Sequence, residues 1–296
     1  MSLRARITGT GMAVPECVVD NHLLSRCMST TDEWIFQRTG IRERRVSPDT
    51  YQMLLRLAEA PDKTAYMREE LVEALDEIER DPAVRAVILT GAGGNFSAGG
   101  DVKTMAARRQ TAAEGRERVE LLNRFVLRLF NFPKPTIAMV DGFAVGAGCN
   151  IALGCDMIVA SDRAKFGEVF LKIGLVPDGG GTWLLQRLVG LAKAKEMVLT
   201  AEIIDAAEAL RIGLVNRVVP AGELESATRT LAGKIAAGPP LAATIAKSLL
   251  NRAATVDLAT ALEGEAFGQS NAITSEDHAE GVRAFLEKRV PKFQGR

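Results

Sequence analysis

Two glycine-rich segments, each preceded by an apolar strand-like run, constrain the fold of this chain more than any other feature. Residues 84–90 lead into the segment 91–101, and residues 134–140 lead into the segment 142–148. A helical pattern follows each segment, and this alternation predicts a layered α/β core with ligands at the loop ends. Neither segment has the Lys-Ser/Thr of a P-loop or the spacing of a dinucleotide-binding turn. A tight corner, a phosphate cradle and an oxyanion hole remain open as interpretations.

The stretch 166–182 places a carboxylate at the end of a mostly apolar run. The run breaks at Pro177, and Asp178 then precedes three glycines. One interpretation is a helix N-cap, because the helical pattern 183–188 follows directly. The other is a functional acid, since a carboxylate in apolar surroundings is costly to desolvate unless it is hydrogen-bonded or used in chemistry.

The other periodic segments complete the expected α/β order. Residues 67–80 carry apolar side chains at helical spacing with acids opposite, which predicts an amphipathic helix. Further helices are predicted at 116–130, 149–155, 241–252, 258–269 and 275–288, and further strands at 157–160 and 214–219.

Composition excludes several classes of function. Lys plus Arg equals Asp plus Glu, 37 each, so no global field attracts nucleic acid or an acidic membrane. The four cysteines have no metal-type spacing and only two histidines occur, which argues against a zinc site or a histidine-based triad. No apolar run is long enough to span a bilayer and the first residues lack a signal-peptide core, so we expect a cytoplasmic protein.

Residues 1–50 have a different character and are treated as an N-terminal appendage. Ser-Thr-Thr-Asp-Glu-Trp-Ile at 29–35 and Arg-Thr-Gly-Ile-Arg-Glu-Arg at 38–44 make residues 1–45 similar to the N-terminus of 3-oxoacyl-[acyl carrier protein] synthase III. The resemblance implies that Trp34 and Arg38 contact a CoA adenine. The Cys/His/Asn machinery of that family has no counterpart here. A second acyl-thioester contact, an interaction arm and a fusion relic are the alternatives, and we favour the relic.

Four motifs in order carry a second resemblance, which covers about residues 61–296. They are Phe-Ser-Ala-Gly-Gly-Asp-Val at 96–102, the glycine turn and helix at 142–156, Ile-Gly-Leu-Val-Pro-Asp-Gly-Gly-Gly-Thr at 173–182, and the tail at 275–288. Together they resemble the crotonase, or enoyl-CoA hydratase/isomerase, superfamily. The resemblance implies an α/β ββα spiral core over 51–235 and a C-terminal helical trimerisation region over 236–296. It also implies homotrimers or dimers of trimers.

The same resemblance implies an acyl-CoA substrate, with no cofactor beyond the CoA of the substrate and no metal. By position, the backbone N–H groups of Gly100 and Ala147 would hold the thioester oxygen and stabilise an enolate. Hydratases of this superfamily place water between two glutamates, whose positions fall here at Asn150 and Phe170. The first carries an amide and the second an aromatic ring. A two-carboxylate hydration mechanism therefore has no support in the sequence.

Asp178 remains, at the position that serves as acid/base in many enoyl-CoA isomerases. The corresponding carboxylate is the nucleophile in 4-chlorobenzoyl-CoA dehalogenase. The combination of Asn150, Phe170 and the segment 173–183 is most similar to isomerases of the phenylacetate pathway and to Δ3,Δ2-enoyl-CoA isomerases. A single carboxylate can take a proton from one carbon and return it two carbons away if water is kept out.

Other residues are expected to complete the site. Glu168 is either a second catalytic acid or a solvent-facing or paired acid, and we favour the solvent-facing or paired acid. The expected substrate contacts are Ala98, Asp101, Lys63, Ala65, Phe170, Asn150 and Trp183, with Leu175 and Val176 adding to an apolar wall. Lys63 and Ala65 lie in the segment that helps bind adenine in crotonases. Residues 51–61 leave room for only one of the two strands that usually precede that segment.

The predicted function is an acyl-CoA isomerase with Asp178 as acid/base. The first alternative is another reaction that uses one aspartate, such as dehalogenation or thioester hydrolysis. The second is a weakly active or non-catalytic acyl-CoA-binding subunit, suggested by the shortened N-terminal hairpin.

Overall fold

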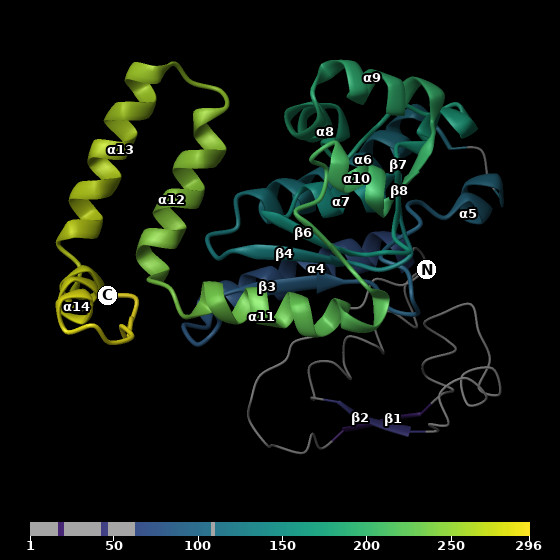
Figure 1. Ribbon diagram of the computed structural model, residues 1–296. Helices are drawn as coiled ribbons and strands as arrows, with labels where there is room; N and C mark the ends of the chain where they lie inside the picture. The colour runs from purple at the N-terminus through teal and green to yellow at the C-terminus, as the bar shows by residue number, and fades with distance from the viewer. Residues whose placement is uncertain (1–16, 21–42, 47–62, 108–109) are drawn as a thin grey trace.

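The computed structural model describes residues 17–20, 43–46, 63–107 and 110–296 (Figure 1). Strands β1 (Cys17–Asp20) and β2 (Glu43–Val46) form an antiparallel pair. The segment 51–61 and both Trp34 and Arg38 lie outside the described residues.

A four-stranded parallel sheet forms the centre of the fold. Its order is β3 (Val87–Thr90), β4 (Thr136–Val140), β6 (Met157–Ser161) and β9 (Arg217–Val219). Parallel strands buried on both faces are expected to be apolar throughout rather than alternating. The strand β4 fits this expectation, since four of its five residues are buried.

Alternate residues of the sheet face two helical layers. Ala138 and Ile158 pack with helices α4 (Lys63–Arg80) and α6 (Ala112–Phe130) in one cluster of buried residues. Ile137, one position before Ala138, and Val159, one position after Ile158, pack against α11 (Leu224–Ala236) on the other face. The apolar side of α4 is buried through Leu71 and Leu75, which confirms the predicted amphipathic helix.

The second sheet is built from the turns that follow the first. Its strands are β5 (Phe143–Val145), β7 (Lys165–Gly167) and β8 (Ile203–Asp205), with β7 parallel to β5 and antiparallel to β8. β4 continues into β5 and then α7 (Ala147–Leu153), while β6 continues into β7 and then the 3-10 helix η1 (Val169–Ile173). This strand–strand–helix repeat confirms the expected ββα core. Strand β8 was not predicted from the sequence.

The remaining helices cover the edges and extend the fold. They are α5 (Val102–Ala107), α8 (Gly181–Val189), α9 (Leu191–Thr200), α10 (Ala206–Arg211), the 3-10 turn η2 (Ala221–Glu223), α12 (Pro240–Ala253), α13 (Leu258–Ile273) and α14 (Glu276–Leu286). The last three confirm the predicted C-terminal helices. Figure 1 shows them projecting away from the sheet as an arm, which we define as residues 240–296.

Polar contacts attach the first helix of the arm to the core. Thr244 and Asn251 donate to the backbone carbonyls of Pro133 and Phe130, each at 2.8 Å. Lys247 pairs with Asp156 at 2.7 Å. No residue of α12 is buried. Within the part of the chain that the structure describes, no helix combines the length and apolar character needed to cross a membrane.

Candidate active site

The fold brings the two glycine-rich segments together. Ser97 forms a β-bridge with Ala144: its N–H donates to Phe143 O at 2.8 Å, and its carbonyl accepts from Val145 N–H at 3.0 Å. Residues 98–100 therefore run beside residues 145–147. Gly99 has φ +81°, and a Cβ built on it would lie 2.8 Å from the Val145 carbonyl oxygen. Only glycine allows this close approach without displacing the backbone.

The N–H groups predicted to form the oxyanion hole lie on these adjacent segments. Ala147 is the first residue of α7, and the N–H groups of a first helical turn have no partner within the helix. Gly146 precedes it with φ +56°, and its own N–H donates to Gly167 O at 2.8 Å. Gly100 follows Gly99 on the neighbouring loop. The two predicted donors therefore lie on neighbouring segments, and their role as an oxyanion hole stays a prediction.

Three of the predicted polar residues converge behind this turn: Asn150, Glu168 and Asp178. The Asn150 amide nitrogen donates to the Asp178 backbone carbonyl at 2.8 Å and lies 3.5 Å from a carboxylate oxygen of Glu168. Asn150 and Glu168 are fully buried, whereas Asp178 is half-buried. The structure thus joins one residue from α7, one from the end of β7 and one from the turn before α8.

Glu168 corrects one of the sequence interpretations. The solvent-facing acid that we favoured is wrong, because Glu168 has no exposed surface. Burial raises the pKa of its carboxyl to about 7, against the opposing hydrogen bond from Asn150 and with a further increase from the charge of Asp178. The neighbouring Cys149 thiol lowers the pKa of Glu168, as the last and smallest of these effects. Burial also raises the pKa of Cys149 well above its ordinary value, and Glu168 adds to that rise.

Phe170 lines the oxyanion turn. Its side chain is 7% exposed, and its ring reaches to 3.8 Å from the point where a Cβ on Gly146 would lie. Leu175 and Val176, the other expected members of the apolar wall, are exposed. Trp183 instead packs edge-on against Phe130 of α6, with ring centroids 5.4 Å apart, and carries the Arg187 guanidinium over its face.

The remaining predicted contacts lie at the edges of the site. Ala98 and Asp101 are exposed on the loop that carries Gly100, and the Asp101 carbonyl accepts from Met105 N–H at 3.1 Å. Lys63 and Ala65 belong to the first turn of α4, and their side chains are outside the described residues.

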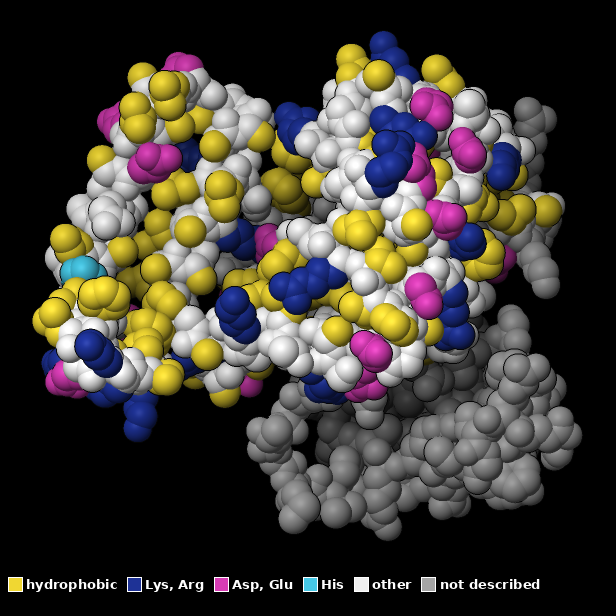
Figure 2. Space-filling view, in the orientation of Figure 1, with side chains coloured by type: hydrophobic (Ala, Val, Ile, Leu, Met, Phe, Trp, Pro, Cys, Tyr) yellow, Lys and Arg dark blue, Asp and Glu magenta, His cyan; other side chains and the backbone are white. Residues whose placement is uncertain are grey.

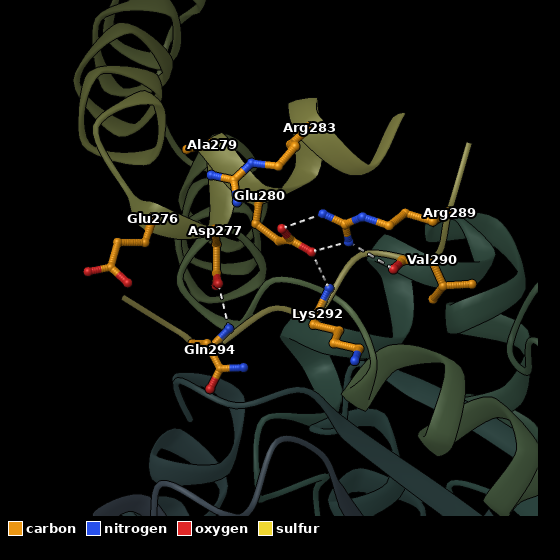
Figure 3. A pocket seen from close by; sticks show the side chains of 9 residues that line it. All are labelled: Glu276, Asp277, Ala279, Glu280, Arg283, Arg289, Val290, Lys292 and Gln294. Atoms are coloured by element: carbon orange, nitrogen blue, oxygen red, sulfur yellow. Dashed lines mark hydrogen bonds and ion pairs between the residues drawn. The ribbon is translucent and has the colours of Figure 1, made fainter. Parts of the chain in front are cut away.

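A separate hollow lies in the arm, and Figure 3 shows its lining. All of its lining residues belong to α14 and the tail that follows. Arg289 pairs with Glu280, and Asp277 accepts from the backbone N–H groups of Gln294 and Gly295. These contacts hold the tail against α14. None of the predicted site residues lines this hollow. Among the described residues, the hollow included, no cluster of His, Cys, Asp and Glu side chains is suited to a metal ion.

The sequence contained a signal for the burial of Glu168 that we did not use. Phe166 and Glu168 are two residues apart on an extended segment, so their side chains point to the same face. Phe166 is fully buried, and Glu168 follows it into the interior. The packing of Asn150 against the glycines after Asp178 had no comparable signal.

Paired glycine turns joined to a ββα core define the class of this protein as an α/β crotonase-like fold. Residues 63–296 match the family model described as enoyl-CoA hydratase/isomerase, and the chain belongs to this family. It is therefore an enzyme of the enoyl-CoA hydratase/isomerase family, and an acyl-CoA substrate is consistent with this membership.

Relatives named as hydratases and a relative named as an isomerase have similar sequence identity to this chain. The chain is 44% identical over 229 residues to a short-chain-enoyl-CoA hydratase from Clostridium acetobutylicum, covering 76% of this chain and 85% of the relative. It is 39% identical over 232 residues to 1,2-epoxyphenylacetyl-CoA isomerase from Escherichia coli, covering 78% and 88%. The crystal structure of an enoyl-CoA hydratase from Bacillus anthracis superposes with a TM-score of 0.75 at 36% identity, covering 78% and 89%. The family match begins at residue 63, so the resemblance of residues 1–45 remains a prediction.

Proposed function

We propose that the protein is an acyl-CoA isomerase that moves a double bond through an enolate, with Asp178 as the acid/base. The observation that carries this proposal is Phe170. The sequence resemblance places one of the two hydratase glutamates at this position, and an aromatic ring packed against Gly146 takes its place. Asn150 occupies the other glutamate position and donates to the Asp178 backbone. Both changes remove carboxylates that would activate water.

In the proposed reaction each residue has one task. The N–H groups of Gly100 and Ala147 donate hydrogen bonds to the thioester oxygen and stabilise the negative charge that develops on it, a contribution worth about 10²–10³-fold per donor. Asp178 removes a proton from one carbon and returns it two carbons away, which general acid–base catalysis makes about 10²–10⁴-fold faster. Phe170 keeps water from the intermediate. No cofactor beyond the CoA of the substrate is needed for this chemistry.

The decisive experiment incubates the protein with 2- and 3-enoyl-CoAs in heavy water and follows the products by mass spectrometry. Isomerisation moves the double bond, and because Asp178 returns the proton that it removed while water is kept out, most of the product should carry no deuterium. Asp178→Asn should abolish the movement of the double bond while acyl-CoA binding persists. The exposed carboxylate of Glu202 provides a matched control, since Glu202→Gln should retain turnover. A fully active Asp178→Asn variant contradicts the proposal.

Hydration is the second candidate, because the relative at 44% identity is named a hydratase. The same experiment separates the two, since hydration adds a molecule of heavy water across the double bond and consumes it, whereas isomerisation keeps the double bond and moves it. Dehalogenation or thioester hydrolysis through a nucleophilic Asp178 would leave a trappable covalent intermediate. Binding of every enoyl-CoA without turnover would favour a non-catalytic subunit.

We also propose that the chain assembles as a homotrimer or a dimer of trimers and works in the cytoplasm. The arm supports the assembly, because it exposes large apolar side chains that water does not stabilise. They include Leu250, Leu258, Leu262, Phe267, Phe285 and Leu286, and Figure 2 shows hydrophobic side chains gathered over the arm.

A further inference from the structure

Glu168 is a buried ionisable group, next to Asp178, that the proposed reaction does not use. It follows the last residue of β7, Gly167, and precedes η1, and its side chain has no exposed surface. One carboxylate oxygen lies 3.5 Å from the Asn150 amide nitrogen. The other has no hydrogen-bond partner among the described residues. Because it is enclosed, Glu168 acts on the reaction only through its neighbours.

Asn150 connects Glu168 to the turn that carries Asp178. Its amide nitrogen also donates to the Asp178 carbonyl at 2.8 Å. The Asn150 side chain fills the inside of this turn so closely that a Cβ on Gly181 would lie 2.5 Å from its amide nitrogen. The amide is thus fixed on one side by the backbone after Asp178 and on the other by Glu168.

We propose that Glu168 is a positioning residue for Asp178: as a neutral acid it supports, through Asn150, the turn that carries Asp178 and leaves the single negative charge of the two carboxyls on Asp178. This rests on the proposed role of Asp178. Two carboxyls that interact in a poorly solvated place do not both ionise readily, and the more buried of the two retains the proton. Glu168 is fully buried and Asp178 half-buried.

The surroundings of Glu168 offer no described cation to balance a charge there. The titratable groups that face it are the Cys149 thiol from α7 and Asp178 from the turn before α8. On the neighbouring elements, Asp205 of β8 caps α10, and Lys193 of α9 pairs with Glu196 and Glu208. Lys165 of β7 and Lys172 of η1 are charged residues of the adjoining segments, and Lys172 is exposed.

The consequence for turnover has a definite sign. Below about pH 7 Glu168 is protonated, and the pair carries only the charge of Asp178. As the pH rises through this value, Glu168 ionises and the pair carries a second negative charge, which opposes the negative charge of the forming enolate. The rate should then fall, by roughly tenfold for each pKa unit of interaction between the charges.

The first test needs no turnover and therefore stands apart from the proposed reaction. Infrared difference spectra of the full chain are recorded over a pH series, following the C=O band of protonated carboxylic acids. We expect a band that disappears near pH 7, is absent in Glu168→Gln, and shifts to lower pH in Asp178→Asn because the neighbouring charge is gone. Absence of the band, or an unshifted band in Asp178→Asn, overturns the coupling.

The second test compares kcat at pH 8.5 with kcat at pH 6.5 within each variant, whichever reaction the enoyl-CoA panel reveals. The wild type should lose roughly tenfold between these values, whereas Glu168→Gln should lose the alkaline decline. Glu202→Gln removes the charge of an exposed carboxylate whose backbone carbonyl lies next to Gly167, and it should keep the wild-type ratio. An unchanged decline in Glu168→Gln overturns the proposal. So does a complete loss of kcat at every pH in a folded Glu168→Gln protein, because Glu168 would then transfer a proton itself.

Discussion

The glycine-turn region and the arm differ in what they bury, since the first encloses polar side chains and the second exposes apolar ones. Around residues 97–181 the core is closed to solvent, and polar side chains such as Asn150 and Glu168 are fully buried in it. In the arm, α12 buries none of its residues, whereas leucines and phenylalanines such as Leu258 and Phe285 are more than 70% exposed.

This difference indicates where each part obtains its stability. A core that has buried its apolar surface can hold polar groups in place for chemistry, at a cost in desolvation. An arm with an exposed apolar face is stabilised only when another surface covers it. Chemistry and assembly should therefore respond to different substitutions, and the predictions below test that separation.

The largest effect should come from charging the arm. Leu258 and Leu262 lie one helical turn apart on α13, and both are exposed. If assembly buries them, each contributes about 1.5–3 kcal/mol, so the double change to Asp should reduce the protein to monomers. Light scattering gives the mass, and circular dichroism checks that the core remains folded. Glu263→Gln on the same helix should retain the assembly, and a monomeric wild type would contradict the prediction.

The next largest effect should come from crowding the two glycine turns. Gly99→Ala places a Cβ 2.8 Å from the Val145 carbonyl at φ +81°, so the loop carrying Gly100 must move. Loss of one oxyanion donor lowers kcat by about 10²–10³-fold. The matched control is Gly93→Ala, where φ is also positive but the added methyl group meets no atom within 4 Å. Turnover and mass are measured together, and a simultaneous loss of assembly in Gly99→Ala would break the separation of the two regions.

Glu168→Gln should change stability in a pH-dependent manner. The folded-state pKa of about 7 lies above the ordinary value of 4.5, so the folded state binds more protons between these values. The contribution of Glu168 to stability is then fully present below pH 4.5 and is lost as the pH rises through 7. At about 1.4 kcal/mol per pKa unit, Glu168→Gln should gain up to roughly 3 kcal/mol over wild type between pH 5 and pH 8. Urea unfolding at both pH values measures this gain, and a constant difference would contradict it.

The sequence predicted most of the helices and strands, whereas it predicted the contacts between the site residues less well. Apolar runs long enough to cross a sheet, such as the run containing β4, predicted buried parallel strands, and the motif at 173–182 located Asp178. Strand β8 has three residues, too few for a period to be recognised. The spacing from Phe166 indicates that Glu168 points to the interior, but its complete enclosure depends on how β7 pairs with both neighbours, and local sequence does not encode that pairing. The close packing of Asn150 on Gly181 depends on a contact between distant segments.

The smallest predicted effect concerns Arg187, which covers the face of Trp183 with its guanidinium 3.4 Å from the ring centroid. Arg187 is exposed, and cation–π contacts at exposed sites contribute about 0.5–1 kcal/mol. Arg187→Ala should therefore lower the free energy of unfolding by that amount, and Arg252→Ala, an exposed arginine of the arm, should have a smaller effect. Trp183 is also held edge-on by Phe130, so its position in α8 should persist without Arg187. The KM for acyl-CoA then becomes informative. A KM that changes in Arg187→Ala but not in Arg252→Ala would assign the uncovered ring to the substrate pocket. An unchanged KM would assign Trp183 to the packing of α8 on α6.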